Sequence, residues 1–488
     1  MNKYLLLALF VLSAATHLLF FPRPAEVVFD EVYFVTYAND YSLGTYYFDP
    51  HPPLGKLLLA AAGHLSGISG INHDYSNIGN KYQTDTYIWY RLLPLLAGIL
   101  LPLVVYWLCR RLRFSALAAF SAGLFIILEN SLLVQSRFAF LDSMLILAGF
   151  TSLAAYLQYR SLKVPVTFTK RFEMRRCGWL ILTALWAAVA FDFKWTGLAF
   201  SLIIVLIELW DIVGAPRKMV AIKHAIKFFV VLLVVGLTVY MVTFAVHFTL
   251  LPKSGQGNAF MSAAFQKTLI DSTYRNDPTI STPGFLVKFF ELNEQMYSVN
   301  AHMNAAHQYS SKWYTWPFMA RPIFYWQGSA SSTAAMVEGT ATAPIADRDV
   351  NSYIYLFGNP FIYWLGALVM TGLIVNGLWL LSIGSLVKDR KIVHRAPVFI
   401  AVGFLVNFLP FIFIGRVMFL YHYQAALVFS ILAIAYILDQ LKGRRKYILI
   451  GAAILLALTA FIFWSPISYG TPLSQEQLQS RMWFPNWR

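Results

Sequence analysis

Long apolar runs alternate with short polar segments along the chain, and this alternation predicts membrane-spanning helices. A helix needs about 20 mostly apolar residues to cross the hydrocarbon core of a bilayer. By this criterion the sequence contains eleven candidate spans, at 4–21, 88–108, 114–130, 139–158, 178–193, 196–213, 228–248, 360–384, 396–414, 417–437 and 447–464. We therefore expect an all-α polytopic membrane protein with about eleven transmembrane helices.

Two long segments, 22–87 and 249–359, lie between the predicted spans. In the first, Pro52 and Pro53 would start a short apolar helix, because proline suits the first helical turn. That helix, 54–65, is too short to span and is expected to lie along the membrane surface. In the second, the tryptophans and tyrosines of 309–326 suit an interfacial aromatic belt. We expect 1–488 to form a single membrane-embedded domain with interfacial helices in these two loops.

The composition supports membrane embedding. The chain is 58% hydrophobic and only 12% charged, whereas soluble domains carry about 25% charged residues. Cys109 and Cys177 are the only cysteines, which excludes a disulfide framework or a cysteine-based metal site. Interpretation of the net charge of +15 depends on where the charges lie.

The basic residues concentrate in alternate loops. Of the 38 lysines and arginines, 21 fall in five short loops: 109–113, 159–176, 215–227, 388–395 and 441–446. The positive-inside rule assigns these loops to the cytoplasm. The N-terminus is then cytoplasmic, and 22–87, 249–359 and the C-terminus lie outside. The charge thus reports topology, and we expect no nucleic-acid partner.

Two other interpretations of the apolar segments remain. The first span could be a cleaved signal peptide, but its apolar run is long for that role and no clean A-x-A site follows. A secondary transporter would show inverted repeats and polar groups near the membrane midplane. The sequence shows no such repeat, and its charged residues cluster at the outer span ends.

An acidic pair, Asp30 and Glu31, directly follows the first span. Ionisable residues at membrane depth are costly and usually functional, although lysine and arginine can snorkel to the surface. Asp30 could alternatively cap the next helix, and His51 could be an ordinary loop histidine. Eight further ionisable residues share this predicted side: His51, Lys56, Arg91, Arg137, Asp142, Lys194, Arg416 and His422.

These residue types suit group transfer from a lipid-linked phosphate. Arginine binds phosphate through two parallel hydrogen bonds, and lysine binds it as a point charge. A nearby carboxylate can accept the proton of an incoming hydroxyl. Such a transferase needs no nucleotide-binding loop, and the sequence contains no G-x-x-x-x-G-K-[ST] stretch.

Seven stretches resemble a known family: "FDEVYF", "HPPLGK", "SRFAFLDSML", "FKWTGL", "SKWYTWPFMARP", "RVMFLYHY" and "MWFPNWR". The chain is similar to the protein O-mannosyltransferases, which depend on dolichyl-phosphate-mannose. The resemblance implies a GT-C-type membrane glycosyltransferase. Such an enzyme would transfer mannose, with inversion, from a polyprenyl-phosphate-mannose donor to Ser/Thr hydroxyls of secreted or membrane proteins. Eukaryotic members insert a MIR domain in the large outer loop, and 249–359 is too short for one. We therefore expect a bacterial form in the cytoplasmic membrane, with its site on the outer face.

The resemblance also implies site roles. Asp30 would be the general base, and Glu31 would help to hold the site. Arg91 would contact the donor phosphate. Donor-phosphate binding would also involve Arg137, Lys194, His51, Lys56 and Arg416, with Asp142 and His422 in support.

Cofactor, partners and acceptor are less constrained. We assign no metal, although a divalent cation remains open because such ions bind carboxylates and phosphate. A translocon contact would follow if glycosylation accompanies secretion, but no residue argues for it. The main alternative is a related lipid-carrier glycosyltransferase with a glycolipid, lipid A or polysaccharide acceptor. "HPPLGK" and the aromatic segment 309–326 favour the protein-modifying enzymes.

Overall fold

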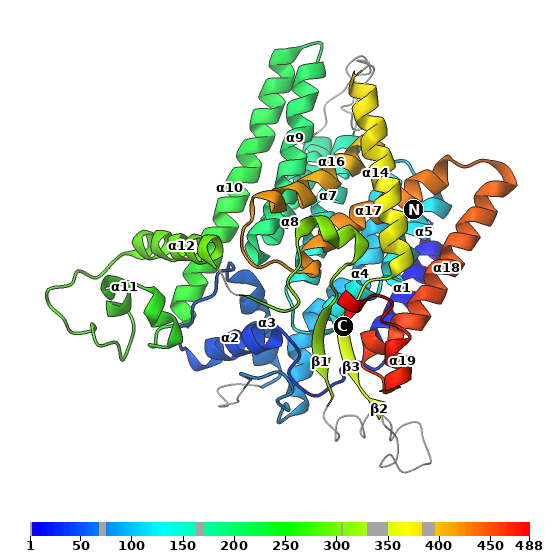
Figure 1. The fold of residues 1–488 in the computed structure, drawn as a ribbon. Helices are drawn as coiled ribbons and strands as arrows, with labels where there is room; N and C mark the ends of the chain where they lie inside the picture. Colours follow the sequence, from blue (N-terminus) through cyan, green and yellow to red (C-terminus); the bar gives the residue numbers. More distant parts are fainter. Residues whose placement is uncertain (1, 68–74, 163–169, 304–305, 329–349, 383–395) are drawn as a thin grey trace.

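The computed structural model describes residues 2–67, 75–162, 170–303, 306–328, 350–382 and 396–488. Its long helices form a bundle, and short helices and strands lie at the lower end of this bundle (Figure 1). The bundle helices are α1 (Lys3–Leu18), α4 (Ile88–Arg111), α5 (Ala116–Ile127), α6 (Asn130–Arg137), α7 (Asp142–Ser161), α8 (Lys170–Phe193), α9 (Leu198–Gly214), α10 (Lys218–Leu250), α14 (Pro360–Ser382), α16 (Ala396–Phe408), α17 (Gln424–Gln440) and α18 (Gly443–Tyr469).

Smaller elements occupy the lower end of the bundle in Figure 1. Its helices are α2 (Glu31–Leu43), α3 (Leu54–Leu65), α11 (Ala263–Lys267), α12 (Phe285–His302) and α19 (Gln475–Gln479). Its strands are β1 (Ile323–Gln327), β2 (Val350–Asn351), β3 (Tyr353–Leu356) and β4 (Leu473–Ser474), paired antiparallel as β1 with β3 and β2 with β4. Short 3₁₀ helices join them: η1 (Asp85–Tyr87), η2 (Trp195–Gly197), η3 (Gln256–Phe260), η4 (Trp313–Phe318), η7 (Leu409–Phe413), η8 (Leu420–Tyr423) and η9 (Pro485–Trp487).

Within the described residues, eight helical segments are long and apolar enough to cross a membrane. They match eight of the eleven predicted spans. Of the other three, 4–21 forms the shorter apolar helix α1, and 139–158 forms α7, which carries Gln158 and Arg160 near its end. The predicted span 114–130 is divided between α5 and α6, which bend by 59° at a short break. The multi-pass character is confirmed, whereas the number eleven is not.

Close helix packing depends on glycine at a few positions. A Cβ atom at Gly149 of α7 would overlap the ring of Phe200 on α9, and one at Gly98 of α4 would overlap Ser136 and His17. Small residues let helices approach closely inside membranes, where the hydrophobic effect adds little. Helix α10 also exposes large apolar residues such as Phe229, Leu233 and Leu237.

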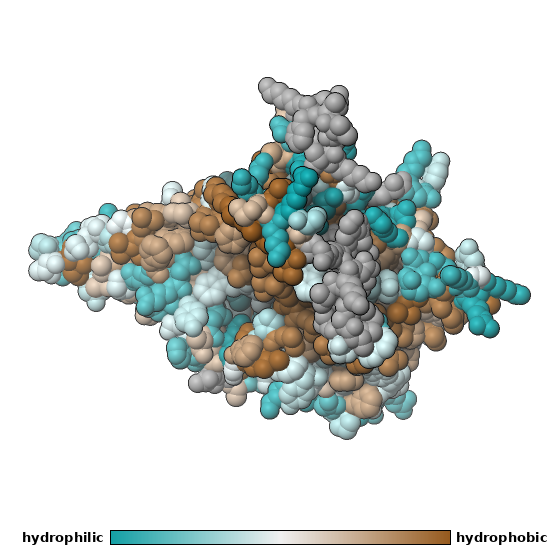
Figure 2. Space-filling view, turned by 90° about the horizontal axis from the view of Figure 1, so that it is seen from above, coloured by the Kyte–Doolittle hydropathy of each residue, from teal (hydrophilic) through white to brown (hydrophobic). Residues whose placement is uncertain are grey.

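Figure 2 views the molecule from the upper end of Figure 1 and shows brown, apolar side chains over the flanks of the bundle. Teal, hydrophilic side chains form separate groups on the same face. Large exposed apolar surfaces mark contact with a membrane or a partner. This distribution agrees with a multi-pass membrane protein.

Polar contacts connect the basic loops, or the residues next to them, in two pairs: 109–113 with 441–446, and 159–176 with 215–227. Asp439, before the loop 441–446, accepts hydrogen bonds from Ser115, and its Oδ1 lies 2.7 Å from the Nζ of Lys446. In the second pair, Tyr159 lies 2.8 Å from His224 across the loops 159–176 and 215–227. The fifth basic loop, 388–395, lies outside the described residues. These contacts agree with a shared side for the basic loops.

The segments predicted to lie on the other side also contact one another. Trp326 of β1 donates a hydrogen bond to Glu26 over 2.9 Å, and Asn300 of α12 donates to the carbonyl of Pro50 over 2.8 Å. The tail joins them through β4, which pairs with β2. The first loop, the large loop and the tail therefore form one assembly at the lower end of the bundle (Figure 1).

Candidate active site

The acidic pair lies where α2 begins. Asp30 immediately precedes the helix and is half-buried, whereas Glu31 is its first residue and is fully buried. Acidic residues are favoured at this end because the helix dipole is positive there. The Asp30 side chain makes no capping hydrogen bond. The alternative that Asp30 merely caps the helix therefore has no support in its geometry.

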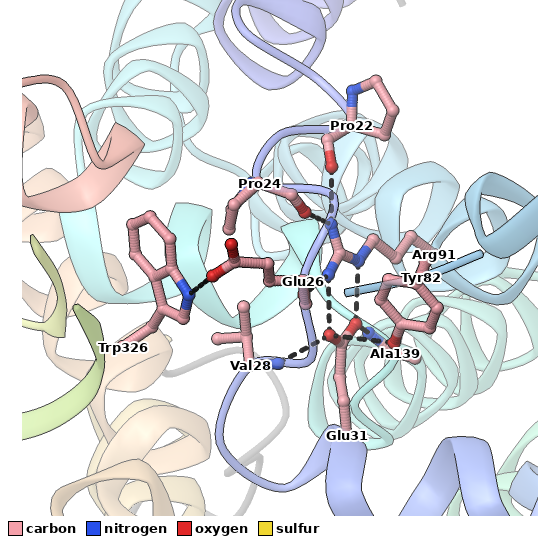
Figure 3. A network of polar contacts seen from close by, with 9 residues as sticks. All are labelled: Pro22, Pro24, Glu26, Val28, Glu31, Tyr82, Arg91, Ala139 and Trp326. Carbon is pink, nitrogen blue, oxygen red and sulfur yellow. Dashed lines mark hydrogen bonds and ion pairs between the residues drawn. The ribbon is translucent and has the colours of Figure 1, made fainter. Parts of the chain in front are cut away.

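Glu31 holds the site together from inside. Its carboxylate receives two hydrogen bonds from Arg91, at 2.8 and 2.7 Å. It also accepts from the backbone N–H of Val28 at 3.0 Å and of Ala139 at 2.9 Å, and from the hydroxyl of Tyr82 at 3.3 Å (Figure 3). A buried carboxylate with this many donors is an anchor for the loops around it.

Arg91 is fully occupied by the protein. Besides Glu31, its guanidinium donates to the backbone carbonyls of Pro22 and Pro24 and to that of Glu26 at 2.7 Å (Figure 3). These contacts account for all five N–H groups of an arginine. In this structure Arg91 positions Glu31 and the segment 22–26, and its expected contact with the donor phosphate stays a prediction.

The Asp30 carboxylate has no side-chain hydrogen bond among the described residues. Burial raises the pKa of Asp30 to about 7, against the opposing effect of Lys194 and with further increases from Asp142 and Asp49. Desolvation therefore outweighs the opposing effect of the Lys194 cation on the Asp30 pKa. A carboxylate with a pKa near 7 is well suited to exchange a proton at neutral pH.

Lys194 lies close to Asp30, at the junction of α8 and η2. Its Nζ atom is 2.8 and 2.9 Å from the two carboxylate oxygens of Asp142, the first residue of α7. Asp142 also accepts a hydrogen bond from Gln135 at 2.8 Å. Lys194 has one further N–H without a partner in the described structure, and its ammonium group lies 5.3 Å from the ring of Tyr421.

Lys56 fixes the loop that carries His51. Its Nζ lies 2.7 Å from the Oδ2 of Asp49 and donates to the carbonyls of His51 and Pro52 at 2.7 and 2.8 Å. All three ammonium protons are therefore used within the loop, and the side chain is only 1% exposed. Lys56 thus has a structural role in this loop, and its expected contact with the donor phosphate stays a prediction.

His51 faces the basic residues of the site. Burial lowers the pKa of His51 well below its usual value, and Lys194, Lys56 and Arg416 lower it further. Its ring makes no hydrogen bond among the described residues. His51 is therefore a neutral imidazole that can donate or accept one hydrogen bond toward a ligand.

Arg416 precedes the short helix η8, and His422 lies within it. Arg416 is half-buried and has no hydrogen bond within the described structure, and burial lowers its pKa. The Nδ1 atom of His422 lies 3.0 Å from the carbonyl oxygen of Phe419, and its ring stacks on Tyr421 and Trp316. Arg416 is thus an unoccupied guanidinium next to a rigid aromatic stack.

Arg137 lies at the end of α6, against the last turn of α1. It donates to the carbonyls of His17 and Leu19 at 2.9 and 2.7 Å, and its guanidinium lies 4.9 Å from the ring of Tyr469. Carbonyls at a helix C-terminus attract cations. These contacts join α1, α6 and α18 through one nitrogen, Nη1. The Nε and Nη2 atoms of Arg137 are buried without a hydrogen-bond partner among the described residues, so its expected role in donor-phosphate binding stays a prediction.

An apolar cavity of about 650 Å³ opens beside these residues. Its walls come from α7, α8, α9, α10 and α16, and residues such as Leu202, Leu233 and Val406 line it. Asp142 and His422 lie in the same lining. Its mainly apolar walls with a few polar groups suit a hydrocarbon chain with a polar head.

Two residues of the site were missed by the sequence analysis. Gln135 and Tyr325 are buried and joined by a hydrogen bond of 2.8 Å, and Gln135 contacts Asp142. A glutamine within an apolar run was a detectable signal, since polar groups in such runs are costly. Tyr325 lies in an aromatic segment that has many tyrosines, so nothing in the sequence distinguished it.

Metal binding was tested on the same residues. Among the described residues, no group of three or more His, Cys, Asp or Glu side chains could hold a metal ion.

Fold and site together define a class: a multi-pass membrane protein with a poised carboxylate and free cations at one end of an apolar cavity. Two family models match the chain. The model of dolichyl-phosphate-mannose-protein mannosyltransferase matches residues 7–252, and that of the C-terminal four-helix transmembrane region of protein O-mannosyltransferase matches 285–487. The chain belongs to the protein O-mannosyltransferase family.

Among curated relatives, protein O-mannosyl-transferase 1 of Mus musculus is 35% identical over 272 residues, which cover 54% of this chain and 36% of that protein. The chain thus matches little more than a third of that relative's length. Among solved structures, the Saccharomyces cerevisiae protein O-mannosyltransferase Pmt1-Pmt2 complex bound to the sugar donor has a TM-score of 0.83 at 20% identity, covering 100% of this chain and 92% of that chain.

A more distant fold neighbour is ArnT from Cupriavidus metallidurans, solved bound to undecaprenyl phosphate. It has a TM-score of 0.52 at 16% identity, covering 96% of this chain and 66% of that chain. At such identities both structures show the fold alone, which is the GT-C fold expected from the sequence.

Proposed function

We propose that this protein is an inverting glycosyltransferase that moves mannose from a polyprenyl- or dolichyl-phosphate-mannose donor to Ser/Thr hydroxyls of secreted or membrane proteins. The observation that carries the proposal is the half-buried Asp30 carboxylate, which has no side-chain hydrogen bond to any described residue and a pKa raised to about 7. It lies close to Lys194, whose partner Asp142 lines the apolar cavity.

The donor lipid would occupy the apolar cavity, with its phosphate at the polar end. Within the described residues Lys194 and Arg416 keep N–H groups without a partner, and His51 and His422 can add hydrogen bonds to the phosphate. Preorganised charge of this kind is usually the largest catalytic contribution when negative charge develops.

The reaction would proceed in one displacement. The acceptor hydroxyl oxygen attacks C1 of mannose while Asp30 takes its proton. The bond between C1 and the phosphate oxygen breaks, and the phosphate leaves with the electron pair from the opposite face, so the configuration inverts. Lys194 and Arg416 stabilise the charge on the leaving phosphate, and Asp30 later releases its proton to solvent.

The membrane orientation follows from the charge pattern. We place the basic loops and the N-terminus in the cytoplasm, and the C-terminus and the site on the outer face of a bacterial cytoplasmic membrane. The large loop 249–359 would lack a MIR domain. Donor lipid and secreted acceptor would then meet beside Asp30 at the membrane surface, without any implied contact with a translocon.

Asp30→Asn tests the assigned base, with Asp40→Asn on the same helix as the matched control. Purified protein would receive polyprenyl-phosphate-mannose and a Ser/Thr-rich peptide, and mannosylated peptide would be measured. We expect Asp30→Asn to lower the rate of mannose transfer by roughly 10²–10⁴-fold, the usual contribution of a general base. Asp40→Asn should keep the wild-type rate. Near-normal turnover by folded Asp30→Asn would exclude this role.

The same assay distinguishes the acceptor. Release of mannose from the carrier without peptide modification would move the proposal to a glycolipid, lipid A or polysaccharide acceptor. If folded wild-type protein turns over no lipid-linked sugar, the proposal that it is a glycosyltransferase is rejected. The alternative of a secondary transporter would then be tested.

A further inference from the structure

A chain of hydrogen bonds leads from the large outer loop to Lys194. The hydroxyl of Tyr325, on β1, donates to the Oε1 of Gln135 over 2.8 Å. The Nε2 of Gln135 donates to Asp142 over 2.8 Å, and Asp142 holds the ammonium of Lys194. A glutamine amide has one accepting and one donating end. The Asp142 carboxylate can only accept, so it faces the donating end, and the Tyr325 hydroxyl stabilises this orientation by donating to the other end.

The ring of the same tyrosine contacts the other half of the site. Tyr325 stacks on Phe29, with ring centroids 4.3 Å apart and an angle of 13° between the planes. Phe29 directly precedes Asp30, and its φ is +43°. That backbone region is unfavourable for a side chain of this size and persists only where neighbouring groups enforce it. The Tyr325 ring is one of those neighbours.

The position of Tyr325 is itself determined by the β1–β3 pair. The pairing register is irregular between Phe324 and Trp326, so Tyr325 lies at the irregular position. Such bulges redirect a side chain and occur often beside active sites. Here the side chain is fully buried, and its ring also contacts Phe140 edge-on at 5.5 Å.

We propose that Tyr325 is a positioning residue that orients both reacting sides of the site at once. Its ring stacks on Phe29 and thereby fixes the orientation of the neighbouring base Asp30. Its hydroxyl acts through Gln135 and Asp142 on the phosphate-binding Lys194. This inference rests on the proposed function, and it makes the large outer loop a determinant of catalytic geometry.

Two variants separate the hydroxyl from the ring. Tyr325→Phe keeps the stacking and removes the hydrogen bond, so we expect the KM for polyprenyl-phosphate-mannose to rise about tenfold with the pH profile of kcat unchanged. Tyr325→Leu removes both contacts and is expected also to lower kcat by at least about tenfold and to shift that profile. Tyr355→Phe, on the partner strand β3, is the matched control and should behave as wild type.

A double variant tests the path through Gln135. Gln135→Met has a similar size and no amide, and alone it should raise the KM for the donor as Tyr325→Phe does. If the hydroxyl acts through this amide, the two changes combined should raise KM no further than either alone. Additive effects would overturn the relay.

The remaining outcomes are distinguishable. Active wild-type protein with an unchanged donor KM in Tyr325→Phe would reject the hydroxyl relay and leave the proposed function intact. A wild-type kcat and pH profile in folded Tyr325→Leu would reject the role of the ring. Failure of wild-type protein to transfer mannose would instead reject the function on which the inference rests.

Discussion

At the scale of single residues, the site depends on which charges are already satisfied. Arg91 and Lys56 are buried, and their N–H groups are bound within the chain, so they build the site. Arg416 and His51 have no side-chain hydrogen bond in the described structure, so they remain available to a ligand. Asp30 and Glu31 are neighbours in sequence, yet one is free and the other has five donated hydrogen bonds.

The pH dependence of turnover follows from Asp30. Since the base must be ionised and burial raises its pKa to about 7, kcat should rise with pH and level off above about 7. Lys194 lowers the pKa of Asp30, so Lys194→Met should move the rise to higher pH besides weakening donor binding. The measurement is kcat from pH 5 to 9, with Lys288→Met as the control. A profile unchanged by Lys194→Met would contradict the assignment of Asp30.

Arg91→Met should destabilise the fold strongly. It would leave the buried Glu31 carboxylate without its cation, and breaking a buried ion pair costs about 3–5 kcal/mol. Arg23→Met, at an exposed position in the segment 22–26 that Arg91 contacts, should cost little. Thermal unfolding in detergent compares the two, and equal stability of both variants would show that Arg91 is not the anchor inferred here.

At the scale of elements, helix contacts bring the site residues together from distant parts of the chain. α7 begins with Asp142, α8 ends just before Lys194, and α2 begins just after Asp30. The close approach of α7 to α9, where Gly149 meets Phe200, helps to set the start of α7 relative to the cavity. Packing within the membrane thus determines the spacing of the polar groups at its surface.

Gly149→Ala tests this packing. The added methyl group would overlap the Phe200 ring, and overpacking a core costs about 1–3 kcal/mol. Gly178→Ala on α8 has nothing within 4 Å and should be neutral or slightly stabilising, since alanine favours a helix by roughly 0.5–1 kcal/mol. Thermal unfolding of both variants is the measurement, and a neutral Gly149→Ala would mean that the helices separate easily.

At the scale of the whole molecule, an extended apolar surface and an asymmetric charge distribution define how the protein sits in the membrane. Eight or nine candidate spans, counted within the described residues, carry basic loops toward one end and the site toward the other. The charge distribution agrees with the proposed topology, in which the site faces outward.

Cys177 provides a test of this topology. It is exposed and lies on the predicted cytoplasmic side, whereas Cys109 is buried. A membrane-impermeant maleimide should therefore label wild-type protein in inverted vesicles and leave it unlabelled in intact cells. Ser480→Cys in a Cys177→Ser background, on the predicted outer side, should show the opposite pattern. Labelling of Cys177 in intact cells would invert the proposed orientation.

The apolar pattern sufficed to predict the class of fold, because burial in lipid demands long continuous apolar helices. It was less reliable for α1, for α7 and for the bent pair α5–α6, where short or polar helices are supported by neighbours within the protein. At the site, motif resemblance selected residues that lie in or around it, yet it could not separate ligand-binding from structural roles for Arg91, Lys56 and Arg137.

The sequence by itself thus determined the membrane class, the alternation of basic and acidic loops, and the acidic pair at the end of the first span. Only the tertiary structure decided which charges are free. The partners of Arg91 are mostly backbone carbonyls in a turn more than 60 residues away, and Tyr325 reaches Gln135 across 190 residues. Such contacts depend on how turns and strands pack after folding. They therefore cannot be predicted from residue type alone.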